Sequence, residues 1–260
     1  MNLAFCGICY MKRPWPSYLD RAAADGWRNH ELVAMPGAFH INAYEVDAKT
    51  IAKELGARNI TLRAIHTGGL VTHMPEMREK QLAYNKHVIG LLEELGADQL
   101  VFTGGPRDRE SLDDLAKAVE QIAGYLDGTK VKLGLENHYG NRIEKAEDYD
   151  FLFSRVKHPQ IGMTADFGHF HSSKVDTPAL LRKHADRLFH VHIKDHKGTQ
   201  SMPLGEGEVD MLGLLKTLKE IGYDRALSVE LEVADLENLD KYAADAQKYL
   251  TRIATEAGII

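Results

Sequence analysis

Short apolar runs alternate with amphipathic segments along almost the whole chain. The apolar runs have the length and composition of parallel strands buried on both faces, and they are Leu3–Ile8, Glu31–Ala34, Ile60–His66, Gln99–Thr103, Val131–Glu136, Ile161–Asp166, Leu188–Lys194 and Leu227–Leu231. The segments between them have helical spacing of apolar residues, and include Tyr44–Leu55, Met74–Leu95, Arg109–Leu126, Tyr149–Arg155, Pro178–His184 and Met211–Ile221. Repeated strand–helix units predict an α/β fold in which the parallel strands close into a (β/α)8 TIM barrel.

The chain is expected to form a single domain over residues 1–260, because no linker or low-complexity segment interrupts this alternation. The longest polar, glycine-rich insertion is Lys197–Asp210, and it follows an expected strand. Active sites of TIM barrels are built from the loops after the strands. We therefore expect this loop to cover the functional site.

The amino-acid composition argues against a membrane protein and against a nucleic-acid-binding protein. Hydrophobic residues make up 44% of the chain and charged residues 27%, and no apolar run approaches the roughly 20 residues that cross a bilayer. The apolar stretch at the start precedes the first basic residues, which reverses the layout of a secretory signal. We expect a soluble, cytoplasmic protein without a membrane partner. A net charge of −6 without a lysine or arginine cluster argues against a nucleic-acid partner.

Four of the apolar runs end in a carboxylate or an imidazole: Glu136, Asp166, His192 and Glu230. In a barrel, the carboxyl ends of the strands meet at one rim, which carries the catalytic groups. One such residue alone is more often a rim residue or a helix cap, but four strands ending this way seldom arise from structural needs. Three carboxylates and one neutral imidazole suit Mn²⁺ or Mg²⁺, and are compatible with Co²⁺ or Zn²⁺. The sequence therefore predicts a site for one divalent metal ion.

Alternation along the strands turns several ionisable side chains to one face. The sets are Glu136 with His138, His190 with His192 and Lys194, and Glu230 with Glu232. Gly134 shares the face of Glu136, as a crowded barrel interior requires. Burying so many ionisable groups is costly unless a metal or counter-charge satisfies them.

Further polar residues near the same rim are candidates for substrate binding. His66 ends its strand on the inward parity, and His138 lies two residues beyond Glu136. His169 follows Asp166 by three residues and could bind substrate or a metal. Lys194 either faces a substrate oxygen or pairs with Asp195, and the sequence does not choose between the two roles. His190 is expected to be buried and structural.

The two cysteines, Cys6 and Cys9, form a C-x-x-C motif. No second pair is present to complete a four-cysteine zinc site. We interpret them as buried thiols rather than a redox or metal pair.

The motifs LGLENH at Leu133–His138, DFGH at Asp166–His169, HVHIKD at His190–Asp195 and the segment Gly205–Glu232 resemble those of the xylose-isomerase-like TIM barrels. That superfamily contains sugar isomerases and epimerases, and also inosose dehydratases and endonuclease IV. The resemblance covers the whole chain. It implies that Glu136, Asp166, His192 and Glu230 are the metal ligands, that Glu136 and Glu230 form the proton-transfer pair, and that His169 contacts the substrate.

The endonuclease branch is disfavoured, because its three zinc ions need additional ligands. His66 matches its first histidine, but Thr103-Gly104-Gly105 stands where the next histidine would end the fourth strand. The loop Lys197–Asp210 also contains no Asp-x-His element.

The first functional hypothesis is a metal-dependent isomerase or epimerase of a small ketose or keto-polyol. Glu136 or Glu230 would move a proton through a metal-stabilised enediolate. The alternative is a metal-dependent dehydratase of a keto-inositol or related polyol, because the same enediolate can expel a hydroxyl group. A non-catalytic sugar-binding barrel is a third hypothesis, which the carboxylate pair disfavours. The absence of a phosphate-binding glycine loop in the sequence favours unphosphorylated substrates, and the sequence leaves the oligomeric state open, a homo-oligomer included.

Overall fold

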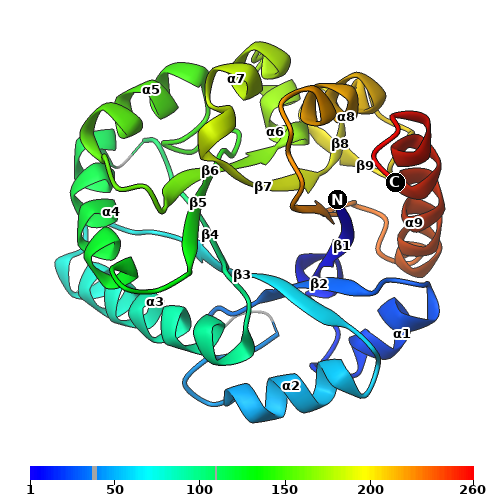
Figure 1. Ribbon diagram of the computed structural model, residues 1–260, viewed down its shortest axis with the longest axis horizontal. Helices are drawn as coiled ribbons and strands as arrows, with labels where there is room; N and C mark the ends of the chain where they lie inside the picture. The colour runs from blue at the N-terminus through cyan, green and yellow to red at the C-terminus, as the bar shows by residue number, and fades with distance from the viewer. Residues whose placement is uncertain (37–39, 109) are drawn as a thin grey trace.

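The computed structural model describes residues 1–36, 40–108 and 110–260. Parallel strands of these residues close into a barrel in the order β1-β10-β7-β6-β5-β4-β3-β2 (Figure 1). The barrel strands are β1 (Asn2–Cys6), β2 (Asn29–Val33), β3 (Thr61–Gly69), β4 (Gln99–Thr103), β5 (Lys132–Glu136), β6 (Ile161–Asp166), β7 (Leu188–Ile193) and β10 (Ala226–Val229). Each matches one of the apolar runs to within a few residues, so the predicted TIM barrel is confirmed.

Helices surround the barrel as an outer ring in Figure 1. They are α1 (Tyr18–Ala24), α2 (Ala48–Gly56), α3 (Pro75–Leu95), α4 (Leu112–Leu126), α5 (Ala146–Arg155), α6 (Phe167–Ser172), α7 (Thr177–Lys183), α8 (Met211–Glu220) and α9 (Leu239–Glu256), with 3-10 turns at Gly7–Tyr10 and Ala185–Arg187. None of the helices in the described part of the chain is long and apolar enough to span a membrane.

Side-chain caps explain where several helices begin. The Asp47 carboxylate accepts a hydrogen bond from the Thr50 amide, so α2 begins at Ala48 rather than at Tyr44 as the apolar pattern suggested. Ser111 caps α4 in the same way, so the helix expected from residue 109 begins at Leu112. Arg109 itself lies outside the described residues.

The structure contains elements that the apolar pattern did not predict. Helix α6 directly follows β6, because the Asp166 carboxylate accepts from the His169 amide and caps it. Helices α1 and α9 were not proposed from the sequence. A hairpin of β8 (Asp195–Lys197) and β9 (Gln200–Met202) lies where a long loop was expected.

Glycines allow close approach of strands β5, β6 and β7. Gly134 pairs with Gly162 across β5 and β6, and a Cβ atom added at Gly134 would lie 2.1 Å from Thr164 Oγ1. This confirms the crowded interior expected at Gly134. A Cβ atom at Gly162 would lie 2.3 Å from the Arg187 carbonyl oxygen.

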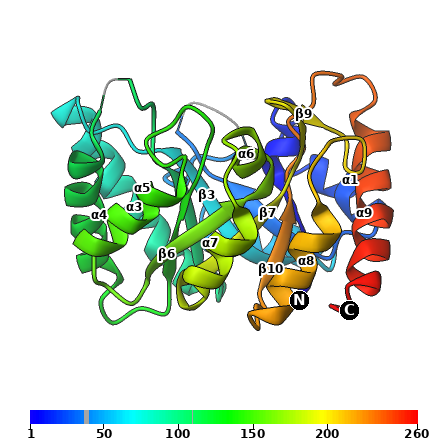
Figure 2. The same ribbon diagram turned by 90° about the horizontal axis from the view of Figure 1, so that it is seen from above.

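The apolar core lies between the barrel and the helices. Val191, Ile193 and Val229 are fully buried there, as outward alternation from the ionisable face requires. In the view of Figure 2, both chain ends lie at one edge of the molecule, while α6 and β9 lie at the opposite edge. That opposite edge is the rim to which the strands deliver their last residues.

Candidate metal centre

Four side chains converge at the carboxyl ends of β5, β6, β7 and β10. Glu136 and Asp166 end their strands, His192 lies one residue before the end of β7, and Glu230 follows β10. Their ligand atoms all lie within 4.8 Å of one another. From His192 Nδ1, the distance is 2.7 Å to Glu136 Oε1, 3.8 Å to Glu230 Oε2 and 3.9 Å to Asp166 Oδ2. The structure thus brings together the four residues that the sequence selected as ligands.

The chemistry of this cluster fits a bound cation. Asp166 and His192 are fully buried, and Glu136 and Glu230 are nearly so. Asp166 Oδ2 has no hydrogen-bond partner among the described residues. Burial raises the pKa of Asp166 to about 7, and the nearby Glu230 and Glu136 add to the rise. The charged neighbours of Asp166 Oδ2, Lys194 Nζ at 3.4 Å and His192 Nδ1 at 3.9 Å, make no hydrogen bond to it. A buried carboxylate oxygen without a hydrogen bond is costly, and a divalent ion would satisfy it.

Lys194 lies beside the centre. Its Nζ is 2.6 Å from Glu230 Oε2, 2.6 Å from Glu232 Oε2 and 3.4 Å from Asp166 Oδ2. Although burial lowers the pKa of Lys194, the carboxylates raise it well above its usual value, so the side chain is an ammonium ion. Of the two roles that the sequence left open, this position favours the one at the site.

Asp195 instead fastens the loop that follows β7. Its carboxylate accepts hydrogen bonds from the amides of Gly205, Gly207 and Val209, at 2.9, 3.0 and 3.2 Å. A Cβ atom at Gly207 would lie 2.1 Å from Asp195 Oδ1, so a glycine is needed for this close approach. The Lys197–Asp210 segment is therefore anchored to the rim next to Lys194, and its closure over a ligand stays a prediction.

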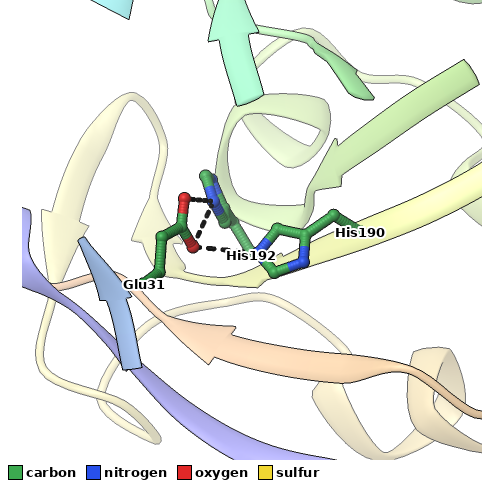
Figure 3. A group of neighbouring side chains, drawn as sticks. All are labelled: Glu31, His190 and His192. Carbon is green, nitrogen blue, oxygen red and sulfur yellow. Dashed lines mark hydrogen bonds and ion pairs between the residues drawn. The ribbon is translucent and has the colours of Figure 1, made fainter. Parts of the chain in front are cut away.

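Glu31, on β2, is the residue that the sequence analysis missed. Figure 3 shows its carboxylate facing the rings of both His190 and His192. The distances are 2.8 Å from His190 Nε2 to Glu31 Oε2 and 3.1 Å from His192 Nε2 to each Glu31 oxygen. Although burial lowers the pKa of His192, Glu31, Glu136 and Glu230 raise it well above its usual value, so both ring nitrogens carry protons that the carboxylates accept. If a metal ion replaced the Nδ1 proton, the Nε2 bond to Glu31 would keep the Nδ1 lone pair directed at the ion. A glutamate inside a strand expected to be buried was the available signal.

His190 is buried, as the sequence predicted, and its ring is held by Glu31. Burial lowers the pKa of His190 more than Glu31 raises it. His190 is therefore neutral and serves as a structural partner of Glu31.

The three histidines that were predicted to bind substrate, His66, His138 and His169, lie near the centre. His66 Nε2 lies 2.9 Å from Glu136 Oε2, so it points inward as expected. The His138 and His169 rings are in contact, with centroids 3.7 Å apart. His169 Nε2 lies 3.1 Å from Lys194 Nζ. Burial and the Lys194 charge lower the pKa of His169, so its neutral ring accepts a proton of the ammonium group. Their binding of a substrate stays a prediction.

The cysteines are buried free thiols, as the sequence interpretation proposed. Cys9 Sγ accepts from the Leu231 amide at 3.0 Å, and Cys6 Sγ lies 3.8 Å from Glu230 Oε1. Burial raises the pKa of both thiols well above the usual value. They help to position the segment after β10.

A buried arginine supports the opposite side of the rim. Arg142, in the loop after β5, donates to the carbonyls of Leu70 and Gly104 and forms a 2.6 Å ion pair with Glu110. It thereby ties together the loops that follow β3, β4 and β5.

The fold and this arrangement of side chains define a TIM barrel with a candidate metal centre at the carboxyl ends of its strands. The chain belongs to the xylose isomerase-like TIM barrel family, whose model matches residues 19–253. The resemblance found in the sequence motifs is therefore confirmed.

Known proteins are similar to this chain over most of its length. An inosose dehydratase from Lacticaseibacillus casei is 24% identical over 247 residues, which cover 80% of this chain and 82% of that protein. The crystal structure of the IOLI protein with a bound zinc atom has a TM-score of 0.81 at 17% identity over 99% of both chains. An L-ribulose 3-epimerase has a TM-score of 0.80 at 20% identity over 99% of this chain and 96% of that one. At these identities the solved structures show the fold alone.

The comparisons correct the order of the functional hypotheses. Several relatives found by sequence are named as inosose dehydratases, so the dehydratase alternative is better supported than the isomerase or epimerase that the sequence analysis placed first.

Proposed function

We propose that this protein is a divalent-metal-dependent dehydratase that removes water from a keto-inositol or a related small polyol. The observation that carries the proposal is the position of Lys194, whose ammonium lies 2.6 Å from Glu230 and 3.1 Å from His169. Dehydration needs a base for a carbon-bound proton and an acid for the departing hydroxyl group. Lys194 would be the acid, next to a carboxylate that would be the base.

The residues have separate roles in this proposal. Glu136, Asp166, His192 and Glu230 would hold the metal ion, Mn²⁺ or Mg²⁺ by their oxygen-rich chemistry and Zn²⁺ or Co²⁺ as alternatives. When bound, the ion would polarise the substrate carbonyl and stabilise the negative charge that develops on its oxygen. His66, His138 and His169 surround the same space and would hold the substrate hydroxyl groups.

In the proposed reaction Glu230 accepts one proton and Lys194 donates one. Glu230 first takes the proton from the carbon next to the carbonyl, and the electron pair of that C–H bond shifts toward the carbonyl oxygen, so that an enolate of the substrate forms. In a second step this electron pair forms the new carbon–carbon double bond as the C–O bond to the departing hydroxyl breaks. Lys194 donates a proton to the departing hydroxyl, which leaves as water. Because Lys194 Nζ lies 2.6 Å from Glu230 Oε2, the proton on Glu230 can return to Lys194 and restore both groups.

An epimerase is the second candidate, favoured by the presence of Glu136 and Glu230 in one cluster. Two carboxylates on opposite sides of a carbon can remove a proton and return it from the other face. Epimerisation needs no acid at Lys194, whereas the proposed dehydration does. Substitution of Lys194 therefore distinguishes the epimerase from the dehydratase.

The test is incubation of the manganese-loaded protein with keto-inositols and ketohexoses in D₂O, followed by NMR and mass spectrometry. We expect a keto-inositol to lose one water molecule. Lys194→Met should abolish water loss while deuterium exchange beside the carbonyl continues, and Glu230→Gln should abolish both. Lys117→Met, an exposed lysine on α4, is the matched control and should behave as wild type.

A product that retains its water and differs only in configuration would replace the dehydratase proposal by the epimerase. Full dehydration by Lys194→Met would exclude this lysine as the acid.

A further inference from the structure

We propose that the Lys194 ammonium fills a second cation site beside the metal centre, so that the native chain holds one divalent ion and a chain without this side chain holds two. The inference rests on the proposed metal centre but on no substrate or reaction. It assigns a latent metal site to His138, His169 and Glu232.

The surroundings of Lys194 Nζ have the composition of a metal site. The nitrogen has four acceptors within 3.4 Å: Asp166 Oδ2, Glu230 Oε2, Glu232 Oε2 and His169 Nε2. An ammonium group has three protons to donate, so it is surrounded by more acceptors than it can fully satisfy. Three carboxylates and an imidazole are also the ligand types present in the candidate centre itself.

Two of these acceptors, His169 and Glu232, also belong to a second cluster of potential metal ligands, which His138 completes. Ligand atoms of His138, His169 and Glu232 lie within 4.8 Å of one another. Two imidazoles and one carboxylate are a known zinc-binding set. His169 Nε2 already faces a cation, because it lies 3.1 Å from Lys194 Nζ.

The latent site adjoins the proposed metal centre. Asp166 Oδ2 and Glu230 Oε2 face His192 Nδ1 at 3.9 and 3.8 Å, and the same two oxygens face Lys194 Nζ. They would therefore be shared between neighbouring cations, as carboxylates are in two-metal sites. Asp166 Oδ2 is fully buried and has only the 3.4 Å ion pair with Lys194 Nζ and the 3.9 Å contact with His192 Nδ1 among the described residues, so it can face both cations.

The fold holds the lysine in this position. Lys194 is 1% exposed, and its stem passes over Gly168, where an added Cβ atom would lie 2.8 Å from Lys194 Cγ. A second divalent ion would have to displace this buried ammonium and take its carboxylates. The consequence for chemistry is that the site presents a proton donor where a second ion would present a Lewis acid.

The experiment compares metal stoichiometry in the native protein and in Lys194→Ala. Each full-length protein is stripped with a chelator, dialysed against excess Zn²⁺, freed of unbound ion and analysed for zinc. We expect one ion per chain in the native protein and in the exposed-lysine control Lys117→Ala, and two in Lys194→Ala. The double variant Lys194→Ala/His169→Ala should return to one ion, which locates the second ion at His169.

Manganese provides a second readout, because two adjacent Mn²⁺ ions interact magnetically. The electron paramagnetic resonance spectrum of Lys194→Ala should show coupled ions, and that of the native protein should show an isolated ion. One ion per chain in Lys194→Ala, or two in the native protein, would overturn the inference.

Folding of the variant is part of the test. Removing the ammonium leaves neighbouring carboxylates uncompensated, so metal-free Lys194→Ala should be less stable than the native protein. Zinc should restore its melting temperature with saturation at two equivalents, against one for the native protein. A Lys194→Ala chain that stays unfolded in excess zinc would contradict the inference, because the second ion should replace the lost charge.

Discussion

Glu31 should control metal affinity without touching the metal. The Glu31→Leu substitution keeps a side chain of similar size but removes the acceptor for His192 Nε2 at 3.1 Å and for His190 Nε2 at 2.8 Å. The His192 ring then loses the bond that directs its Nδ1 lone pair toward the other ligands. A misdirected ring, or one with its proton on Nδ1, is a poorer ligand.

The size of the effect follows from the contacts that are lost. Removing an outer partner of a metal-binding histidine typically lowers metal affinity about 10- to 100-fold, which corresponds to ~1.4–2.7 kcal/mol. A hydrogen bond to a charged group is worth about 1.5–3 kcal/mol, so losing the His192–Glu31 bond agrees with that range. Glu31→Gln should have a smaller effect, because its amide oxygen can still accept the Nε2 proton.

Competition with a coloured chelator measures these affinities at fixed pH. The matched control is His190→Asn, which removes the other partner of Glu31 and leaves the His192–Glu31 contact in place. We expect its metal affinity to stay within a few-fold of the native value. Unchanged affinity in Glu31→Leu, or an equal loss in His190→Asn, would refute the role of Glu31 in directing His192.

Three further outcomes are expected. His192→Ala should lower metal content steeply, because it removes the one nitrogen ligand of the predicted set, and elemental analysis showing native content would exclude the assignment. Burial lowers the pKa of His30 to about 3, whereas a histidine in the unfolded chain has a pKa near 6.5, so the unfolded chain takes up a proton at a higher pH than the folded one. The contribution of neutral His30 to the free energy of unfolding is therefore fully present above pH ~6.5 and falls by up to ~1.4 kcal/mol per pH unit below it. Urea unfolding at pH 7 and pH 5 should show a smaller loss in His30→Gln, and equal losses would contradict this origin. Gly162→Ala should destabilise the barrel by about 1–3 kcal/mol, because the new Cβ would lie 2.3 Å from the Arg187 carbonyl oxygen, whereas Gly90→Ala on α3, with open space around it, should be neutral or stabilising by thermal unfolding.

The sequence by itself determined the barrel and the four candidate metal ligands. Strands buried on both faces are continuous apolar runs, so the transition to a polar residue marks the end of the strand. The parallel strands of a barrel all end at the same rim. Four residues that end different strands are therefore expected to lie close together, although they are far apart in the chain. Glu136, Asp166, His192 and Glu230 could therefore be grouped before any coordinates were known.

Only the tertiary structure decided which side chains support that group. Glu31 meets His190 and His192 across the barrel interior, 159 and 161 positions away along the chain, and this contact depends on how the sheet closes. Lys194 lies two residues after His192, so the sequence places both side chains on one face. That Lys194 forms ion pairs with Glu230 and Glu232 follows from the register of β7 and β10.

The short elements at the rim were also beyond the apolar pattern. The Asp166 carboxylate caps α6 by accepting a hydrogen bond from the His169 amide, and the Asp195 carboxylate accepts from amides of the segment that follows the β8–β9 hairpin. Such contacts between a side chain and the backbone leave no hydrophobic periodicity in the sequence. Hydrophobic periodicity in the sequence indicates which face of a helix or strand is buried. Contacts between polar side chains depend on distances between strands, and these distances are fixed only when the barrel closes.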